Sequence, residues 1–450
     1  MTALPRTVDG TRLLRRLDEL AQIGSTGDGG VCRLALTVED GAGRDLVVTW
    51  MHDLGLRVDI DGIGNVVGTW PADRFDPPVM MGSHVDTVRT GGRYDGNLGV
   101  LAGLEVIETA IDATIAGALD PARLPHPLAV ALFTDEEGAR FAPDMLGSLT
   151  YVGGLALEDA LDSEDATGLR VGDELERIGY VGPQPCPGPV PRAFVELHIE
   201  QGPVLERGGI TIGAVTGVQG ISWSELTITG QSNHAGTTPM AMRHDAGYAA
   251  AAIATFVRRL AKVLGGAQVA TVGRLDLHPD LINVIPARAV LTVDLRNTDP
   301  VVLLDARHRL ADYVAELAED EGVTIEMRSL AEFAPVVFDE RLVAMIEEVA
   351  RAAGHTVRRL PSGAGHDAQM LARVCPAAMV FVPSDDGISH NPAEHTDAAD
   401  IAAGADVLLE VVLRLATDAG PLPPADDGST GATPAEDTDP NDRHDAGVRM

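Results

Sequence analysis

The chain has 450 residues, and 45% of them are hydrophobic, which supports two domains and excludes global disorder. Its formal net charge of −33 argues against nucleic acid and anionic membrane surfaces as partners, because both require a basic face. The three cysteines, Cys32, Cys186 and Cys375, are widely spaced, so neither a disulfide framework nor a paired-cysteine zinc site is predicted.

The first twenty residues predict an amphipathic helix and not a targeting signal. This segment has no apolar core, and Asp9 and Asp18 interrupt it. No run of about 18 uncharged apolar residues occurs in the chain, so no membrane span is expected. We therefore expect a cytoplasmic protein.

Residues 1–211 have the pattern of an α/β domain. Strands at Val79–Gly82 and Ala129–Phe133 enclose a helix at Leu98–Ala113, which is the order of a βαβ unit. The other elements predicted here are helices at 11–22 and 43–54 and strands at 64–69 and 193–197. Polar residues follow several strand ends, where open α/β sheets build their sites.

Residues 212–330 have a different pattern, typical of a small α+β sandwich. Its predicted strands are 211–218, 222–230, 268–275, 288–296 and 323–328, and its helices are 245–263 and 300–320. The α/β pattern then returns in residues 331–418, with a helix at 339–353, a strand at 378–383 and a helix at 397–416. We therefore expect one catalytic domain in two parts with a second domain inserted. Residues 419–450 are rich in Pro, Gly, Asp, Ser and Thr and predict a disordered acidic tail.

The first candidate site segment follows the strand that ends at Gly82. His84 and Asp86 are two residues apart, so on an extended segment their side chains share a face. A carboxylate so placed can orient a metal-bound imidazole. Asp95 lies in a glycine-rich turn before a helix, where it could bridge two cations. Taken alone, this pattern also fits a capped turn with a surface histidine.

Three further segments follow apolar strands in the same way. Glu136 and Glu137 are adjacent, so one can bind a metal while the other acts as a general base. His198 and His390 follow two later strands, whereas His395 is expected at the surface. A solvated acidic loop and a buried core histidine are the alternatives for single segments. Nitrogen and oxygen donors without thiolate suit Zn²⁺, Mn²⁺ or Co²⁺.

These candidates resemble, in order and context, the metal site of the M20-type metallohydrolases. Within that group, EEGARF (136–141), HIEQGPVLE (198–206), NHAGTTPM (233–240), INVIP (282–286) and GISHNPAE (387–394) are similar to the hydantoinase/carbamoylase branch. That branch contains N-carbamoyl-L-amino-acid hydrolases, β-ureidopropionases and allantoate amidohydrolases. The resemblance implies a mixed-sheet catalytic domain of the phosphorylase/hydrolase-like class, which binds two metal ions through His84, Asp95, Glu137, His198 and His390.

The resemblance also implies catalytic roles. Glu136 would be the general acid and base, and Asp86 would orient His84. His234 would stabilise the oxyanion from the inserted lid domain of the partner in a homodimer. Peptidases of the group commonly carry an acidic ligand where this chain has His198, which disfavours an aminopeptidase or aminoacylase.

Five residues are implied to contact the substrate. Asn283 and Arg296 would hold its carboxylate, and Gln201 would hydrogen-bond its amide or carboxylate. Gly363 and Ala364 would offer backbone donors, in a loop whose glycines permit close approach. For His366 in the same loop, a structural role stays as open as a functional one.

The resemblance therefore predicts a metal-dependent amidohydrolase that cleaves the ureido C–N bond of an N-carbamoyl-L-amino acid to the amino acid, CO₂ and ammonia. Allantoate amidohydrolase and β-ureidopropionase are the alternatives. An aminoacylase or dipeptidase, or an inactive binding protein on the same fold, is less favoured. The inactive protein would be expected to lack a ligand or the base, and this sequence has all of them.

Overall fold

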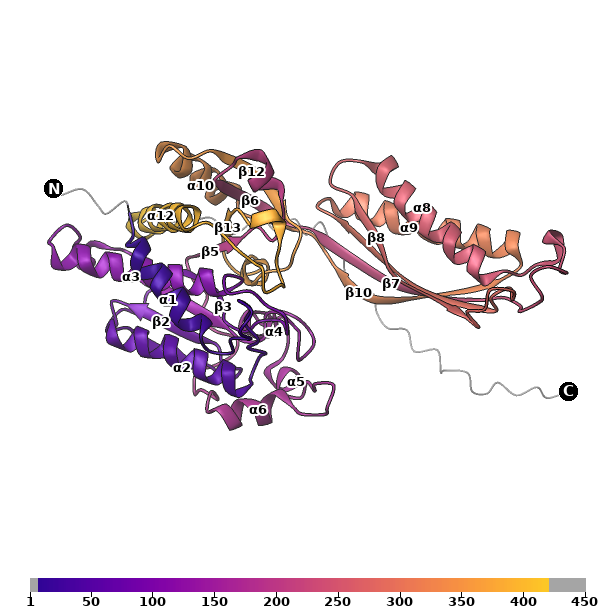
Figure 1. Ribbon diagram of the computed structural model, residues 1–450. Coiled ribbons are helices and arrows are strands. Elements are labelled where there is room, and N and C mark those ends of the chain that lie inside the picture. The colour runs from indigo at the N-terminus through magenta and orange to yellow at the C-terminus, as the bar shows by residue number, and fades with distance from the viewer. Residues whose placement is uncertain (1–6, 421–450) are drawn as a thin grey trace, which may run out of the picture.

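The computed structural model describes residues 7–420 (Figure 1). The predicted tail, residues 419–450, therefore lies almost entirely outside the described residues, as do the first six residues of the expected amphipathic segment. Among the helices of the described part of the chain, none is both long and apolar enough to cross a membrane.

A nine-stranded mixed sheet forms the larger part of the molecule. Its strands are β1 (Arg57–Ile60), β2 (Val66–Trp70), β3 (Val79–His84), β4 (Leu128–Phe133), β5 (Ala193–Ile199), β6 (Ile212–Val218), β11 (Val336–Val337), β12 (Val357–Ser362) and β13 (Ala377–Val382). They run in the order β1-β2-β4-β3-β5-β13-β6-β11, and β12 pairs with β6. The neighbours β4, β3, β5 and β13 are parallel and fully buried, which explains their almost continuous apolar sequences.

Helices cover this sheet. Helices α1 (Gly10–Ala21), α3 (Asn97–Ile115), α10 (Glu340–Ala352) and α12 (Ala398–Thr417) form one connected layer, and α2 (Val38–Asp53) packs on β1 and β2. The short helices are α4 (Leu146–Tyr151), α5 (Leu157–Leu161), α6 (Val171–Ile178), α7 (Val204–Gly208) and α11 (Asp367–Leu371), with 3₁₀ turns at Pro121–Arg123, Met240–Met242 and Asp385–Gly387. Side-chain caps fix several helix starts: Asp9 accepts the first free N–H groups of α1, and Asp339 those of α10.

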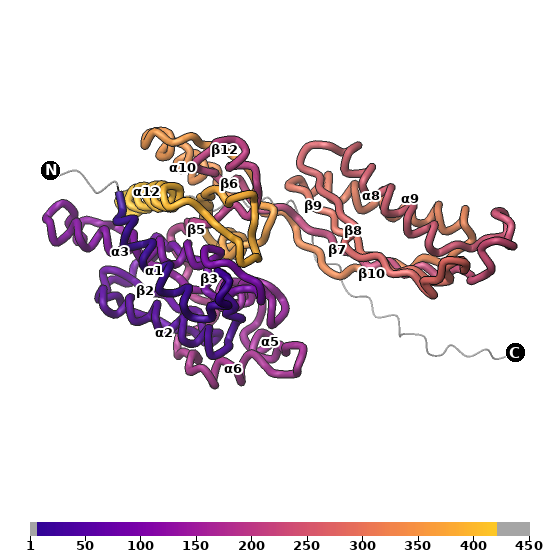
Figure 2. The backbone as a smooth tube through the Cα atoms, in the orientation of Figure 1, coloured from indigo at the N-terminus to yellow at the C-terminus, as the bar shows by residue number. Residues whose placement is uncertain are grey.

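A second, smaller unit projects from this body (Figures 1 and 2). Its strands β7 (Gly220–Thr229), β8 (Val269–His278), β9 (Arg288–Asn297) and β10 (Thr324–Phe333) form an antiparallel sheet in the order β10-β7-β9-β8. Helices α8 (Ala246–Leu264) and α9 (Pro300–Glu321) pack on it around a hydrophobic core of their own. The predicted fold class, an α/β domain with an inserted α+β sandwich, is confirmed.

Some boundaries differ from the prediction. The sequence analysis assigned 211–218 to the inserted unit, but β6 pairs with β11, β12 and β13 in the large sheet. Residue alternation predicts a strand without revealing which sheet the strand joins. The small sheet therefore begins at β7, and its last strand runs to Phe333, past the predicted boundary at 330. Helix α2 begins at Val38 and not at 43, because Thr37 caps it.

Candidate active site

Side chains from distant parts of the chain converge at one edge of the large sheet. His84 ends β3, His198 lies next to the end of β5, and Glu136 and Glu137 follow β4. His390 lies in the segment between β13 and α12. Because the carboxyl ends of neighbouring parallel strands lie at the same edge, these residues meet although they span most of the chain.

Asp95 is shared by two groups of ligand atoms. His84, Asp95 and His198 form one group, and Asp95, Glu137 and His390 form the other, with the ligand atoms of each group within 4.8 Å of one another. His198 Nε2 lies 3.1 Å from Oδ1 of Asp95, and His390 Nε2 lies 3.4 Å from Oδ2. Each carboxylate oxygen thus faces a different group, as a bridging ligand requires. These nitrogen and oxygen donors fit divalent cations.

The backbone aims both imidazoles of the first group. His84 Nδ1 is 2.9 Å from the carbonyl oxygen of Asp86, and His198 Nδ1 is 2.9 Å from that of Ile199. These contacts leave both Nε2 atoms directed at the shared carboxylate, as second-shell contacts to metal-binding histidines do. Gly96 has a φ of 65°, and a Cβ there would collide with the His84 ring, so glycine is needed at the start of α3.

Asp86 acts differently from the prediction. Its carboxylate lies 3.8 Å from His84 Nδ1, beyond hydrogen-bond distance, and its main-chain carbonyl orients the ring instead. The carboxylate accepts the N–H groups of Glu136 and Glu137 at 3.4 and 3.3 Å. Asp86 thereby ties the segment after β3 to the segment after β4.

The two adjacent glutamates point to different histidines, and only Glu137 belongs to a ligand group. Oε2 of Glu136 lies 3.4 Å from His84 Nε2, whereas Oε2 of Glu137 lies 3.2 Å from His390 Nε2. Burial, the nearby Asp367 and the other carboxylates raise the pKa of Glu136 well above its usual range. A carboxyl group that can hold a proton suits general acid and base chemistry. The surrounding cavity of about 120 Å³ is lined by Asp95, Glu136, Glu137, Asp144, Gln201, Ala364, Gly365, His366 and His390.

Two imidazoles of the site are strongly basic. Burial opposes protonation of His198, but its hydrogen bond to Asp95 and the charges of Asp95 and Glu196 raise its pKa to about 9. Hydrogen bonds to Asp95 and Glu137 raise the pKa of His390 to about 10. Protons and divalent cations therefore compete for the same nitrogen lone pairs.

Gln201 and Ala364, two of the predicted substrate contacts, line this cavity. Gln201 adopts a φ of 57°, and its Nε2 donates to Oδ2 of Asp95 at 2.7 Å. Its amide thus contacts the bridging carboxylate directly, which the sequence analysis did not foresee.

Arg296 and Gly363 meet where the two sheets adjoin. Nη1 of Arg296 donates to the carbonyl oxygen of Gly363 at 2.8 Å, and its Nη2 pairs with Asp294 at 3.0 Å. A cation from the inserted unit thus lies beside the loop that contributes Ala364 to the cavity.

His234 and Asn283 lie together but far from this cluster. The Ala235 N–H donates to the Asn283 carbonyl oxygen at 2.9 Å, which joins the two loops. Both loops follow the outer ends of β7 and β8, where Thr229 pairs with Arg288, while Arg296 lies at the inner end of β9. The intervening eight residues of strand span about 25 Å, so these two side chains do not join the metal-binding groups of their own chain.

Carboxylates that the sequence analysis passed over also belong to the site, among them Asp144, which lines the cavity, and Glu196 and Glu394, which support the segments that carry the ligands. Oε1 of Glu196 accepts from Ser83 Oγ at 2.7 Å, and Oε2 accepts from the Ala368 N–H at 2.9 Å. Glu196 lies near His198 and His366, but both its oxygens are already engaged. The sequence did contain a signal for Glu196, because a glutamate inside an otherwise apolar strand is unusual. No comparable signal in the sequence pointed to Glu394.

Two further histidines belong to these segments. His366 is buried, its Nε2 lies 2.8 Å from Ser362 Oγ, and its ring packs against that of His198 where the residue lines the cavity. His395 has a half-exposed side chain and lies at the surface, as predicted.

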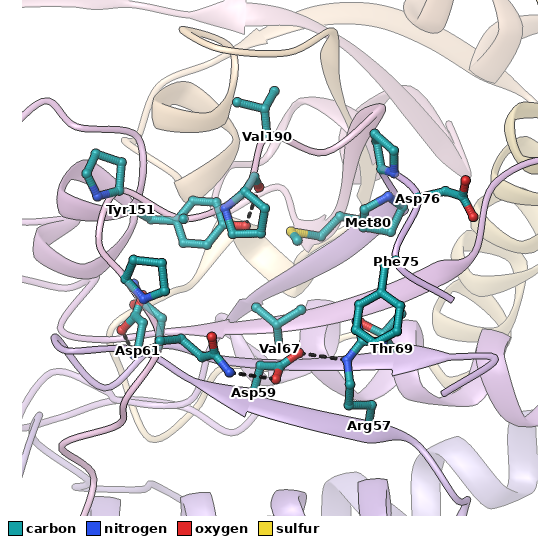
Figure 3. A pocket seen from close by; sticks show the side chains of 18 residues that line it. Arg57, Asp59, Asp61, Val67, Thr69, Phe75, Asp76, Met80, Tyr151 and Val190 are labelled. Carbon is teal, nitrogen blue, oxygen red and sulfur yellow. Dashed lines mark hydrogen bonds and ion pairs between the residues drawn. The ribbon is translucent and has the colours of Figure 1, made fainter. Parts of the chain in front are cut away.

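A larger cavity of about 520 Å³ shares no lining residue with this site (Figure 3). Residues of β1 and β2 line one wall of this cavity, and Phe75 and Tyr151 also line it. Its polar side chains are paired within the wall: Arg57 Nε donates to Asp59 at 2.9 Å, and Asp61 accepts from neighbouring amides. Paired groups of this kind do not call for a ligand, so the smaller cavity is the candidate active site.

Two groups of nitrogen and oxygen ligands at the end of a parallel sheet, beside a buried carboxyl group, define a metal-dependent hydrolase. The sequence pattern of Peptidase family M20/M25/M40 matches residues 80–414, and the chain belongs to this family.

Comparison with similar proteins shows which branch of the family the chain resembles. The chain is 41% identical over 412 residues to an N-carbamoyl-L-amino-acid amidohydrolase of Rhizobium meliloti, covering 91% of this chain and 97% of the relative. It is 36% identical over 400 residues to the allantoate amidohydrolase of Escherichia coli K12, covering 88% and 96%. The crystal structure of a hydantoinase/carbamoylase family amidase from Burkholderia multivorans superposes with a TM-score of 0.87, at 46% identity, over 92% of this chain and 99% of that one. The predicted family and enzyme class are confirmed.

Proposed function

We propose that the protein hydrolyses the ureido C–N bond of an N-carbamoyl-L-amino acid. The observation that carries this proposal is the convergence of two ligand groups on Asp95, with Glu136 beside His84. The similarity to an N-carbamoyl-L-amino-acid amidohydrolase supports the substrate class. Allantoate amidohydrolase activity is the second candidate, because a relative with that name also matches nearly the whole chain.

Two divalent cations, Zn²⁺ or Mn²⁺ with Co²⁺ as an alternative, would occupy the two groups that share Asp95. Bound there, they would lower the pKa of a water molecule and polarise the substrate carbonyl. His84 and His198 would hold one cation and Glu137 and His390 the other.

Glu136 would move the proton. It accepts a proton from the attacking water at its carboxylate while the water oxygen bonds to the ureido carbon. The bond from that carbon to the amino-acid nitrogen then breaks, and Glu136 returns the proton to this nitrogen. The carbamic acid released decomposes to CO₂ and ammonia, which balances the reaction.

Arg296 would bind the substrate carboxylate, because a guanidinium and a carboxylate form a bidentate pair. To do so, Arg296 exchanges its contacts with Asp294 and the Gly363 carbonyl for the substrate. Backbone N–H groups of the loop at Gly363 and Ala364, and the amide of Gln201, would complete the contacts.

A second copy of the chain would supply His234 and Asn283. The distance of about 25 Å along the inserted sheet prevents them from serving the same active site as Arg296 of their own chain. Apolar side chains around them, Met240, Met242, Leu281 and Ile282, are strongly exposed, as expected for a surface that another chain covers. From a partner subunit, His234 would stabilise the oxyanion and Asn283 would hold the substrate. A cytoplasmic homodimer is thus part of the proposal.

The test is ammonia release by protein loaded with Mn²⁺ or Zn²⁺. The substrates are N-carbamoyl-L-amino acids, their D-enantiomers, N-carbamoyl-β-alanine and allantoate, with N-acetyl amino acids and dipeptides as controls. Release from N-carbamoyl-L-amino acids that a chelator abolishes supports the proposal. Preference for allantoate selects the second candidate, and cleavage of the amide controls alone rejects both.

A further inference from the structure

Glu394 connects two segments of the site that lie about 300 residues apart in the sequence. Its Oε1 accepts the N–H groups of Tyr94 and Asp95 at 2.9 and 3.1 Å. Its Oε2 lies 3.1 Å from the hydroxyl of Ser389, and that hydroxyl also lies 2.9 Å from Oδ2 of Asp95. The Glu394 side chain is buried, with the residue 5% exposed. One carboxylate thus fixes both the backbone and, through Ser389, the side chain of the bridging ligand.

The surrounding backbone is shaped to admit this carboxylate. A Cβ at Gly92 would collide with the Glu394 side chain, so only glycine leaves room for it. A second link joins the same two segments: the hydroxyl of Thr90 donates to the carbonyl oxygen of His390 at 3.0 Å. His390 itself has a φ of 55°, a conformation that non-glycine residues seldom adopt without support from their surroundings.

The two ligand groups depend on Glu394 to different degrees. In the group of Asp95, Glu137 and His390, two ligands lie on the segments that Glu394 joins. In the other group, His84 and His198 lie within strands of the buried parallel sheet, and only Asp95 depends on Glu394. Loss of the Glu394 contacts should therefore disturb the group of Asp95, Glu137 and His390 far more than the group of His84, Asp95 and His198.

We propose that Glu394 is a positioning residue that sets the affinity of the cation group formed by Asp95, Glu137 and His390. It contacts neither substrate nor cation and acts through Asp95 and the loop that carries His390. This inference rests on the proposed two-cation function and adds Glu394, a residue to which the sequence analysis assigned no role.

The test measures Co²⁺ binding and needs no substrate. Glu394→Ala removes both acceptor oxygens, whereas a glutamine would keep a carbonyl oxygen able to accept the N–H groups of Tyr94 and Asp95. Ser389→Ala removes only the hydroxyl link and keeps the test open should Glu394→Ala fail to fold. Asp339→Ala is the matched control, because the Asp339 carboxylate also accepts two consecutive N–H groups, of Arg341 and Leu342, at the start of α10.

Chelator-stripped dimer is titrated with Co²⁺ by calorimetry, with the visible absorption of bound Co²⁺ recorded in parallel. We expect two ions per chain in the unmodified protein and in Asp339→Ala. In Glu394→Ala one ion should bind unchanged and the other about 10- to 100-fold more weakly, with an altered spectrum, which is the usual cost of losing a residue that supports metal ligands. Ser389→Ala should change the same ion less.

Two full-affinity ions in Glu394→Ala and Ser389→Ala would overturn the inference and leave the proposed function intact. An equal loss of affinity for both ions would also overturn the inference, because Glu394 would then be a general structural residue. If the unmodified protein bound no Co²⁺, the inference and the proposed function would both fail.

Discussion

The guanidinium of Arg296, on the inserted sheet, donates a hydrogen bond to the carbonyl oxygen of Gly363, in the loop beside the active-site cavity. Asp294 holds the same guanidinium on its other side. The cation is thus positioned where the two sheets adjoin, near the cavity but bound to groups that a substrate carboxylate can replace. Recognition of the carboxylate would then be coupled to a movement of the inserted unit towards the site.

Arg296→Ala should raise KM for N-carbamoyl amino acids by roughly 10- to 100-fold, the cost of losing hydrogen bonds to a charged group. The corresponding carboxamides, which lack the charge, should be affected much less. Arg274→Ala, on the neighbouring strand β8, is the control: its exposed guanidinium pairs with Asp276, and this variant should behave like the unmodified enzyme. Steady-state kinetics with both substrate series makes the measurement. An unchanged KM for the carboxylates would remove Arg296 from the site.

Glu136→Gln should lower kcat by roughly 10²- to 10⁴-fold, the usual contribution of a general base. Metal content should stay the same, because Glu136 is outside both ligand groups. Elemental analysis and initial rates on one preparation test both statements, with the exposed Glu158→Gln on α5 as the control. Retained turnover would show that another group takes the proton.

The convergence of the ligand residues was predictable from local sequence. Each of His84, Glu137, His198 and His390 lies at, near or beyond the end of an apolar strand, and parallel strands end at one edge of their sheet. The two glutamates of the 136–137 pair also point in different directions, but they lie in the bend beyond β4, after Asp135 with a φ of 53°, and not in a strand.

Contacts across the fold could not be predicted in this way. The orienting atom for His84 is the main-chain oxygen of Asp86, while the Asp86 carboxylate binds backbone N–H groups after another strand. Glu394 contacts a segment about 300 residues away, and no local pattern records such a pairing. For the same reason, alternation in 211–218 predicted a strand but not the sheet to which β6 belongs.

Cation binding should release protons. The pKa values of His198 and His390 are raised to about 9 and about 10, mainly by hydrogen bonds to neighbouring carboxylates and against the effect of burial, so protonation of these imidazoles is favoured in the cation-free protein. Such protons must leave when the nitrogens bind cations, so cation binding should release protons. The affinity for cations should therefore rise with pH while these histidines are protonated and level off above the higher of their two pKa values. Calorimetry in buffers of different ionisation enthalpy counts the protons, and binding without proton release would contradict this account.

Mixing two inactive variants should restore activity if His234 acts in the active site of the partner subunit. His234→Ala keeps Glu136 but lacks the oxyanion donor, whereas Glu136→Gln keeps His234 but lacks the base. In a mixed dimer, the site with an intact Glu136 receives an intact His234 from the other chain. Random reassortment of equal amounts makes half of the dimers mixed, each with one complete site, so about a quarter of the original activity should return.

The control is a mixture of Glu136→Gln with His84→Ala, two variants that both damage the catalytic domain. Its mixed dimers contain no complete site, because each catalytic domain lacks one of its own residues. Activity in the first mixture and none in the second would support a partner-supplied His234. Absence of activity in both, with subunit exchange verified by differently tagged chains, would place His234 in the reaction of its own chain. The separation of about 25 Å along the inserted sheet leads us to expect recovery only in the first mixture.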